Sequence, residues 1–246
     1  MVADKIAFVT GAGSGIGREV CRILARQGAK VITADRNLTT AQETIESLND
    51  SKHLALDLDV SNSSSIKQAF KNAISTYSTP PSIIVNSAGV TRDQFILKLT
   101  EAEFDQVLDV NLKGTFLVIQ TAVKAMIEAG TSKGGSIVNV SSIIGKIGNI
   151  GQANYASSKA GVEALTKTAS LEFGQFGVRV NAVLPGFIDT SMTQTVPDNV
   201  KQMFVKRIPL GRMGKPEEVA EVITFLASSK SSYINGASID VTGGMH

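Results

Sequence analysis

Along the whole chain, short runs of apolar and β-branched residues alternate with longer stretches in which apolar residues recur at helical spacing. The short runs predict strands near 5–10, 30–35, 53–57, 82–86, 135–140, 178–184 and 237–242. The longer stretches predict helices near 15–28, 38–49, 62–77, 101–129, 152–174 and 216–228. This order is typical of an α/β protein with a doubly wound parallel sheet of seven strands flanked by helices. No composition shift or internal repeat divides the chain, so we expect a single domain over residues 1–246.

Composition and charge exclude several classes of protein. The 24 basic and 22 acidic side chains leave a formal net charge of +2 with no long basic run, so we expect no nucleic-acid partner. The single cysteine, Cys21, excludes an internal disulfide and a zinc cluster, and two histidines leave little material for a metal site. No uncharged apolar stretch reaches about 18 residues and no secretory leader is visible, so we expect a soluble intracellular protein without a membrane span. Acid–base chemistry must therefore come from Tyr, Lys, Ser, Asp or Glu side chains.

A glycine-rich turn follows the first predicted strand, in the sequence Thr10-Gly-Ala-Gly-Ser-Gly-Ile-Gly17, and a predicted helix follows the turn. Glycines in such a turn permit a tight bend, close approach of the backbone to a pyrophosphate, and close helix–strand packing. The helix start adds free N–H groups and the positive end of a dipole. The spacing differs from the usual G-x-G-x-x-G, but its place at the first strand–helix junction predicts a dinucleotide site. The residues expected to contact the cofactor here are Gly11, Gly13, Ser14, Gly15, Ile16 and Gly17.

Asp35 ends the second predicted strand, a short distance after the glycine turn. A carboxylate at this position accepts hydrogen bonds from the adenosine ribose hydroxyls and repels a 2′-phosphate. Ser14 offers no positive charge to such a phosphate, whereas the guanidinium of Arg36 is the group that would serve NADP. The carboxylate therefore predicts NAD as the cofactor, in preference to NADP.

Tyr155 and Lys159 stand four residues apart in a predicted helix, so both side chains lie on one face. A free phenol titrates at about pH 10, and a nearby ammonium lowers that pKa towards neutrality. Ser142 follows the predicted strand 135–140, at the edge of a parallel sheet where ligands bind. Its hydroxyl can hydrogen-bond a substrate carbonyl as the oxygen becomes alkoxide-like. The three residues together predict proton transfer at a carbonyl or hydroxyl group.

These motifs together resemble the short-chain dehydrogenase/reductase family, whose fold is a Rossmann-type sheet, and the resemblance runs nearly from end to end. The residues that carry it are 10–17, Asp59-Val60, Asn86-Ser-Ala-Gly89, Asn111, Ser142, Tyr155, Lys159 and Pro185-Gly186. The resemblance implies that Tyr155 is the general acid/base and that Ser142 orients the carbonyl. It implies that Lys159 binds the nicotinamide ribose and lowers the tyrosine pKa. It also implies that Asn111 holds a water molecule that links Lys159 to solvent as a proton relay.

The resemblance implies further contacts to the cofactor. Asp59 and Val60 match the family's adenine contacts, and Ile188 and Thr190 match its carboxamide contacts. The remaining contacts come from two motifs and the catalytic pair, namely Asn86, Ser87, Ala88, Gly89, Tyr155, Lys159, Pro185 and Gly186. Ser87 departs from the second asparagine that the family usually has at this position.

Within the family, the chain is similar to 3-oxoacyl-acyl-carrier-protein reductases and to 17-beta-hydroxysteroid dehydrogenases of type 8. This resemblance implies NAD(H)-dependent interconversion of (3R)-hydroxyacyl and 3-oxoacyl thioesters, of coenzyme A or of an acyl-carrier protein, in fatty-acid metabolism. One alternative is a 17-beta-hydroxysteroid dehydrogenase that acts on estradiol or testosterone. Another is the NAD-binding subunit of a heterotetrameric ketoacyl reductase, whose own active site contributes little. The complete Ser–Tyr–Lys–Asn set argues against the last alternative.

Assembly and compartment follow from the helices and from the resemblance. Helical segments 112–129 and 155–174 carry apolar residues beyond one stripe, which indicates that a second side is buried. Family members pair these helices across a twofold axis, which implies a homotetramer or a heterotetramer with a carbonyl-reductase-type-4-like subunit. The resemblance to the type 8 enzymes implies that the protein is located in the mitochondrial matrix. Without that resemblance, the expected compartment is the cytoplasm.

The least regular region, 185–215, holds three of the six prolines, and a long loop in a compact domain is often a lid. We expect a lid over about residues 190–212, where the family closes a mobile segment over its substrate. Met192, Val196, Met203 and Phe204 give this segment an apolar inner face suited to an acyl chain. We expect the lid to become ordered when NAD and substrate bind.

Overall fold

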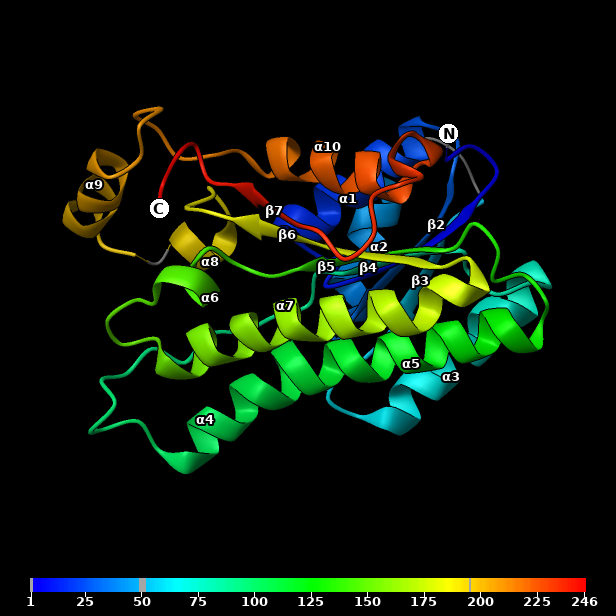
Figure 1. Cartoon of the computed structure of the whole chain (residues 1–246), viewed down its shortest axis with the longest axis horizontal. Helices are drawn as coiled ribbons and strands as arrows, with labels where there is room; N and C mark the ends of the chain where they lie inside the picture. Colours follow the sequence, from blue (N-terminus) through cyan, green and yellow to red (C-terminus); the bar gives the residue numbers. More distant parts are fainter. Residues whose placement is uncertain (1, 49–51, 195) are drawn as a thin grey trace.

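The computed structural model describes residues 2–48, 52–194 and 196–246 (Figure 1). All seven predicted strands are present, and each end lies within one residue of its predicted position. The strands are β1 (Ile6–Thr10), β2 (Lys30–Asp35), β3 (Leu54–Asp57), β4 (Ile83–Asn86), β5 (Ser136–Val140), β6 (Arg179–Pro185) and β7 (Ser238–Val241). Across the described residues, no helix has both the length and the apolar character needed to cross a membrane.

The strands form one parallel sheet in the order β3-β2-β1-β4-β5-β6-β7, which confirms the predicted doubly wound fold. The strand order changes direction between β1 and β4, where Val9 stands opposite Val85. All carboxyl ends meet at one edge, and ligands of such sheets bind at that edge beside the change in order. The fold therefore brings together the glycine turn after β1, the Asn86 motif that ends β4, and Ser142 after β5.

Helices cover both faces of the sheet (Figure 1). Helices α1 (Gly15–Arg26) and α10 (Pro216–Ala227) pack together on one face, with α2 (Leu38–Glu46) beside α1. The other face carries α3 (Ser63–Tyr77), α5 (Gly114–Glu128) and α7 (Ala153–Phe173), and α4 (Glu101–Leu108) packs against α7. Short helices lie at the carboxyl-terminal edge of the strands: α6 (Ile144–Ile147), α8 (Ser191–Gln194) and α9 (Asp198–Lys206).

Alternate residues of the strands enter two apolar cores, because successive side chains of a strand point to opposite faces. In β1, Val9 packs with α1 and α10, whereas Phe8 packs on the other face, where its ring stacks on Phe70 at 4.7 Å between centroids. Full burial of an apolar side chain of this size contributes about 1.5–3 kcal/mol. A parallel sheet covered on both faces requires strands that are apolar on both sides, which explains why short, nearly continuous apolar runs in the sequence mark them.

The ends of the helices differ more from their predicted positions than the ends of the strands do. The helix predicted over 15–28 ends at Arg26, because Gly28 adopts a left-handed φ of 85° on the way into β2. The helix predicted over 101–129 is interrupted by a π-helical turn, Asp109–Lys113, between α4 and α5. The helix predicted over 38–49 ends at Glu46, and its last predicted residue lies outside the described residues.

Candidate active site

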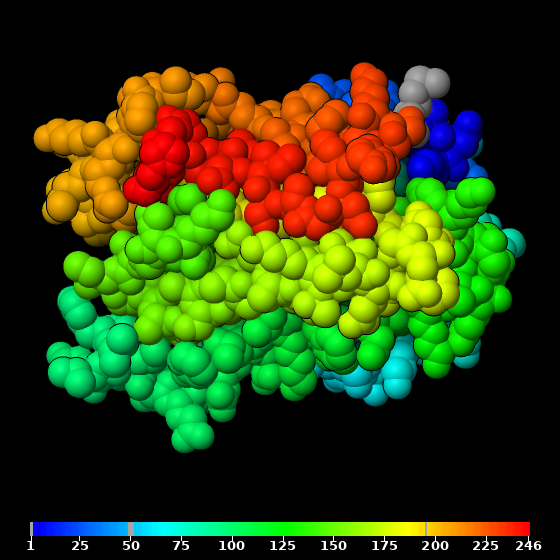
Figure 2. Space-filling view, in the orientation of Figure 1, coloured from blue at the N-terminus to red at the C-terminus, as the bar shows by residue number. Residues whose placement is uncertain are grey.

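A cavity of about 1080 Å³ opens at the carboxyl-terminal edge of the sheet, beside α8 and α9. Its wall comes from the glycine turn, the loops after β2 to β6, the start of α7 and the lid. Figure 2 shows this end of the molecule, where the orange lid lies above the green residues that follow β5. Segments from nearly the whole sequence therefore build one site.

Most of the predicted site residues line this cavity. They are Gly11, Ser14, Gly15, Ile16, Asp35, Arg36, Asp59, Val60, Ser87, Ala88, Gly89, Ser142, Tyr155, Lys159, Pro185, Gly186, Ile188 and Thr190. The other four, Gly13, Gly17, Asn86 and Asn111, support the wall through the contacts described below.

The glycine turn leaves room for a ligand where side chains would fill it. Gly11 has a φ of 62°, and a Cβ there would lie 2.7 Å from the Cα of Ala88. A Cβ on Gly17 would lie 2.2 Å from the carbonyl oxygen of Gly11, so only glycine lets α1 start this close to β1. Helix α1 begins at Gly15 on the cavity wall, so the free N–H groups of its first turn lie beside the cavity. The turn fits the pyrophosphate of a dinucleotide.

Asp35 closes the far side of the turn. Its Oδ2 accepts a hydrogen bond from the backbone N–H of Gly13 at 3.0 Å, and its Oδ1 accepts one from Asn37 at 3.0 Å. These two bonds hold the carboxylate at the cavity wall. Arg36 lines the same wall but is exposed to solvent. This end of the cavity therefore presents a positioned acidic group beside an exposed basic one.

The three predicted catalytic side chains meet at the cavity wall. Tyr155 and Lys159 lie one turn apart on α7, with Lys159 Nζ 5.6 Å from the centroid of the Tyr155 ring. Ser142 shares a hydrogen bond with the Tyr155 hydroxyl. Lys159 is buried, and its Nζ donates to the carbonyl oxygen of Val140 at 2.8 Å. The helical spacing and the parallel sheet together produce the cluster that the sequence predicts.

The direction of the Tyr155 pKa shift corrects one expectation. The sequence predicts a lowered pKa, but burial raises the pKa of Tyr155 to about 12, which outweighs the lowering by the Ser142 hydrogen bond. The carboxylate of Asp93 raises the pKa of Tyr155 further. Burial also lowers the pKa of Lys159 to about 8. Low-dielectric surroundings penalise the charged form of both groups.

Asn111 lies in the π-helical turn and is fully buried. Its Oδ1 accepts from the backbone N–H of Val90 at 2.8 Å, and its Nδ2 donates to the Val90 carbonyl at 3.0 Å and to Ser158 Oγ at 3.1 Å. Ser158 Oγ donates in turn to the carbonyl oxygen of Tyr155 at 2.8 Å. Asn111 therefore joins the loop after β4 to the helix that carries the candidate catalytic pair, a bracing position that a helical pattern alone does not reveal.

The structure also reveals two residues that the sequence did not single out, Asp93 and Asn139, and hydrogen-bond partners of two that it did, Thr10 and Asn86. Asp93 lines the cavity and accepts a hydrogen bond from Gln152 Nε2 at 3.0 Å. Thr10 Oγ1 accepts from the backbone N–H groups of Ser87 and Ala88, both at 3.1 Å. Asn86 Nδ2 donates to Asn139 Oδ1 at 2.8 Å inside the sheet. The positions of Thr10, Asn86 and Asn139 at or next to strand ends are the available signal in the sequence, since that edge holds the site, whereas Asp93 lies in a loop and has no such signal.

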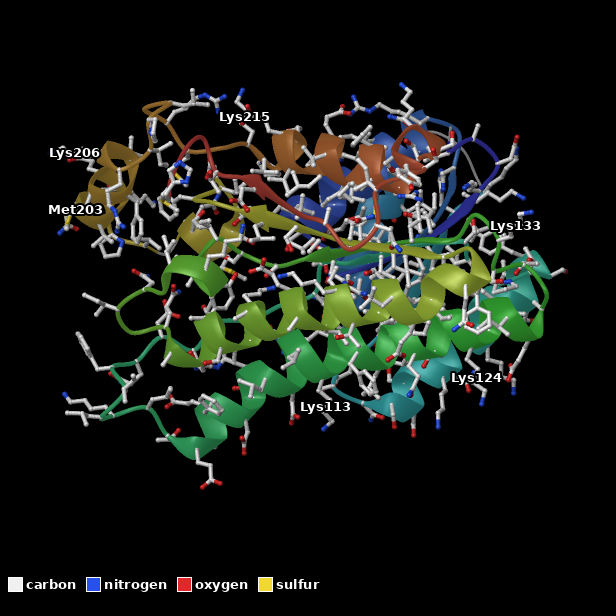
Figure 3. All side chains as sticks on the ribbon, viewed as in Figure 1. Lys113, Lys124, Lys133, Met203, Lys206 and Lys215 are labelled. Carbon is white, nitrogen blue, oxygen red and sulfur yellow. The ribbon has the colours of Figure 1, made fainter. Side chains whose placement is uncertain are left out.

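Three of the four apolar side chains predicted for the inner face of the segment 190–212 line the cavity. Met192, Val196 and Phe204 line the cavity, and Phe204 stacks on Phe187 at 4.9 Å between ring centroids. Met203 does not line it: its side chain is 65% exposed and points away from the molecule (Figure 3). Val200 lines the cavity instead, because it stands one helical turn before Phe204 on the same face of α9. Residue 195, within the predicted lid, lies outside the described residues.

Comparisons with known proteins agree with this geometry. A family model described as enoyl-(acyl carrier protein) reductase matches residues 11–246. The chain is 50% identical to the (3R)-3-hydroxyacyl-CoA dehydrogenase of Mus musculus, over 98% of this chain and 96% of that protein. It is 45% identical to the 3-oxoacyl-acyl-carrier-protein reductase of Thermotoga maritima, over 98% and 97% of the two chains.

Solved structures give the same answer for the fold. A short-chain type dehydrogenase/reductase from Mycobacterium marinum superposes with a TM-score of 0.95 at 34% identity, over 99% of this chain and 96% of that one. In residues 2–48, 52–194 and 196–246, no three His, Cys, Asp or Glu side chains gather to hold a metal ion. The chain belongs to the short-chain dehydrogenase/reductase family and is an oxidoreductase that uses a nicotinamide cofactor and acts on CH–OH groups.

Proposed function

We propose that this chain oxidises (3R)-3-hydroxyacyl thioesters to 3-oxoacyl thioesters and catalyses the reverse reduction, with NAD(H) as its cofactor. The observation that carries the proposal is the meeting of Ser142, Tyr155 and Lys159 in one cavity, between a nucleotide-binding turn and an apolar lid. Two relatives that share about half of its residues are named for the two directions of this reaction.

In the proposed reaction, the substrate oxygen lies between the hydroxyls of Ser142 and Tyr155. Ser142 donates a hydrogen bond to that oxygen and orients it as the C–O bond gains or loses double-bond character. Tyr155 takes the hydroxyl proton during oxidation and returns it during reduction. Bound NAD(H) supplies the hydride exchange at the carbon that carries this oxygen.

Lys159 assists this proton transfer in two ways. An ammonium has three N–H donors, and the Val140 carbonyl uses one of them, which leaves two for the nicotinamide ribose. With a pKa of about 8, Lys159 is mostly protonated at neutral pH and favours the phenolate form of Tyr155. Asn111 braces this helix, and we retain the water relay from Asn111 to Lys159 as part of the proposal.

The remaining contacts divide between the two ends of the cofactor. We propose that residues 11–17 hold the pyrophosphate, that Asp59 and Val60 contact the adenine, and that residues 87–89 close the wall between them, supported from the sheet by Asn86. Pro185, Gly186, Ile188 and Thr190 would contact the carboxamide end.

Asp35 supports NAD over NADP, because its positioned carboxylate repels a 2′-phosphate. We predict that Asp35→Asn lowers the ratio of kcat/KM with NADH to kcat/KM with NADPH by about tenfold or more, since the charge is lost while an acceptor for Gly13 remains. Asp59→Asn, at the adenine, is the matched control and leaves the ratio within about twofold. A wild-type preference for NADPH would contradict the assignment.

The experiment that tests the reaction is steady-state kinetics on acetoacetyl-CoA with NADH and with NADPH, compared with estradiol and NAD. We expect efficient turnover of acetoacetyl-CoA with NADH. Turnover of estradiol with higher kcat/KM would support the hydroxysteroid alternative and overturn the proposal.

We further propose a tetramer, of four copies or with a carbonyl-reductase-type-4-like subunit, in the mitochondrial matrix. Phe116 on α5 and Leu171 on α7 are exposed apolar side chains on the helices expected to pair. Burial of such surface favours association by about 25 cal/mol per Å². Light scattering on the purified chain tests the assembly, and a monomer at micromolar concentration contradicts it. Cell fractionation tests the compartment.

A further inference from the structure

A second cavity, of about 590 Å³, lies beside the catalytic cavity. Two segments build it: the turn 95–98, between β4 and α4, and residues 148–156, which lead into α7. Figure 1 shows both loops at the end of the molecule where α6 and the lid lie. We call this cavity the apolar groove, because its side chains are mainly those of Phe95, Ile96, Leu97, Ile150, Ala153 and Ala156.

Hydrogen bonds fix the two segments to one another. The backbone N–H of Gln94 donates to the carbonyl oxygen of Gly151 at 2.8 Å. Asn154 Nδ2 donates to the carbonyl oxygen of Arg92 at 2.9 Å, and the Asp93–Gln152 bond joins the same two segments. The groove is therefore a defined surface held by polar contacts on one side.

The apolar side chains of the groove face solvent to an unusual degree. Leu97 is 99% exposed and Ile150 is 81% exposed, and Phe95 and Ile96 are exposed beside them. Exposed apolar side chains that stand singly are common, but a contiguous group of them marks a binding surface. Backbone bonds from Lys98 and Leu99 to the Phe95 carbonyl, at 2.8 and 2.9 Å, close the turn that holds this group outward.

The groove is continuous with the catalytic cavity. Asn149 and Ile150 line both spaces. Residues 149–152 are also the segment that leads directly to Tyr155. An elongated ligand whose reacting carbon lies at Tyr155 can therefore extend over Ile150 and reach the groove without crossing a layer of packed residues.

We propose that the apolar groove binds the distal carbons of a long acyl chain, so that the enzyme favours long-chain over short-chain 3-oxoacyl and 3-hydroxyacyl thioesters. This inference rests on the proposed function. An acyl chain is an apolar, flexible occupant that suits a groove of Phe, Ile, Leu and Ala side chains, and each buried methylene contributes about 0.8 kcal/mol. The lid contacts the carbons near the reacting centre, and the groove contacts those beyond it.

The test compares chain-length profiles of the full chain and of the double variant Ile96→Gln/Leu97→Gln, whose two positions line the groove and not the catalytic cavity. Both positions are exposed, so the changes leave the core intact. Leu38→Gln is the matched control, since Leu38 is an exposed leucine, 48% accessible, on α2 and outside both cavities. The measurement is kcat and KM with NADH for 3-oxoacyl-CoA substrates of four, eight, twelve and sixteen carbons, with light scattering on each variant.

In the wild-type chain and in Leu38→Gln, we expect kcat/KM to rise with chain length. The double variant should lose about tenfold or more on the sixteen-carbon substrate, mainly through KM, and keep its four-carbon activity within about twofold. Equal loss at every chain length together with a smaller mass in solution would identify the groove as an interface with another chain and overturn the proposal.

Two further outcomes distinguish failure of the groove proposal from failure of the proposed function. If the wild-type chain reduces acetoacetyl-CoA but the double variant keeps the wild-type profile, the groove proposal fails alone. If the wild-type chain reduces no 3-oxoacyl-CoA of any length, the proposed function fails and the groove proposal fails with it.

Discussion

The cofactor side and the substrate side of the catalytic cavity are built in different ways. On the cofactor side, short polar contacts join residues far apart in the sequence, such as the bonds of Gly13 to Asp35 and of Ser87 to Thr10. On the substrate side, no residue of α8 or of α9 is buried. The lid rests instead on a small apolar cluster that includes Ile208.

The two sides of the cavity therefore differ in the amino-acid substitutions that they tolerate. A tightly packed turn admits few substitutions, because an added atom meets backbone that cannot move. A lid held by a few apolar contacts can change its side chains at little cost in stability. One cofactor site can therefore serve different substrates, and relatives named for acyl-CoA and for acyl-carrier-protein substrates fit that division.

The largest effect is expected where the two sides meet. Tyr155→Phe removes the proton donor and acceptor, so kcat/KM for acetoacetyl-CoA should fall about 10³-fold or more while NADH binding persists. The measurement is turnover of the purified chain together with NADH fluorescence titration. If Tyr155→Phe lowers turnover only in a complex with a partner subunit, and leaves the turnover of the isolated chain unchanged, the subunit alternative is favoured.

The cofactor side should be sensitive to a single added methyl group. Gly17→Ala places Cβ against the carbonyl oxygen of Gly11, so we expect a loss of about 1–3 kcal/mol and a Tm about 2–12 °C lower. Gly174→Ala is the control, since its Cβ would meet only Asn235 Nδ2 at 3.6 Å. Equal melting temperatures for the two variants would show that the glycine turn is not packed tightly enough to exclude a methyl group.

Lys159 predicts a pH dependence of stability. Its pKa falls from 10.5 to about 8 on folding, so the unfolded chain binds more protons across that window, and stability from this group rises with pH. We expect urea unfolding to show wild type gaining about 2 kcal/mol over Lys159→Met between pH 8 and pH 10. Tyr155 acts in the opposite direction, but only above pH 10, because its pKa rises on folding.

The control for this slope is Lys124→Met, since Lys124 is exposed on α5. The control should reproduce the wild-type dependence on pH. A slope that is the same in wild type and in Lys159→Met would show that the buried lysine is not its source.

The smallest effect is expected in the lid, where neighbouring residues face opposite ways. Phe204→Ala removes a ring from the cavity wall, so the acyl chain of the substrate loses part of its apolar contact area. KM for eight-carbon 3-oxoacyl-CoA should therefore rise several-fold, which corresponds to about 1 kcal/mol of binding free energy. Met203→Ala, one residue away and exposed, should leave KM unchanged. Equal effects of both variants would place the acyl chain elsewhere.

Hydrogen exchange compares the lid with the strands of the sheet directly. We expect amide protection in 190–212 to increase when NAD and substrate are added, since a lid with few buried contacts opens easily. Protection of the strands should remain the same. Unchanged protection of the lid would contradict its role as a gate.

Local patterns in the sequence are enough to predict the strands, the glycine turn and the candidate catalytic pair, Tyr155 and Lys159. These features depend on short-range patterns: period-two and continuous apolar runs, backbone freedom at glycine, and the one-turn spacing of Tyr155 and Lys159. Their ends and spacings in the structure agree with the predictions because packing and local preference favour the same conformation.

The remaining features depend on the packing of segments that are distant in the sequence. The raised pKa of Tyr155 depends on burial by several elements, and the bracing position of Asn111 depends on partners in the loop after β4 and in α7. The outward direction of Met203 depends on how α9 is rotated over the cavity, and the apolar groove depends on two loops about fifty residues apart in sequence. Burial, desolvation and contact between distant segments are properties of the packed chain, so no local pattern in the sequence encodes them.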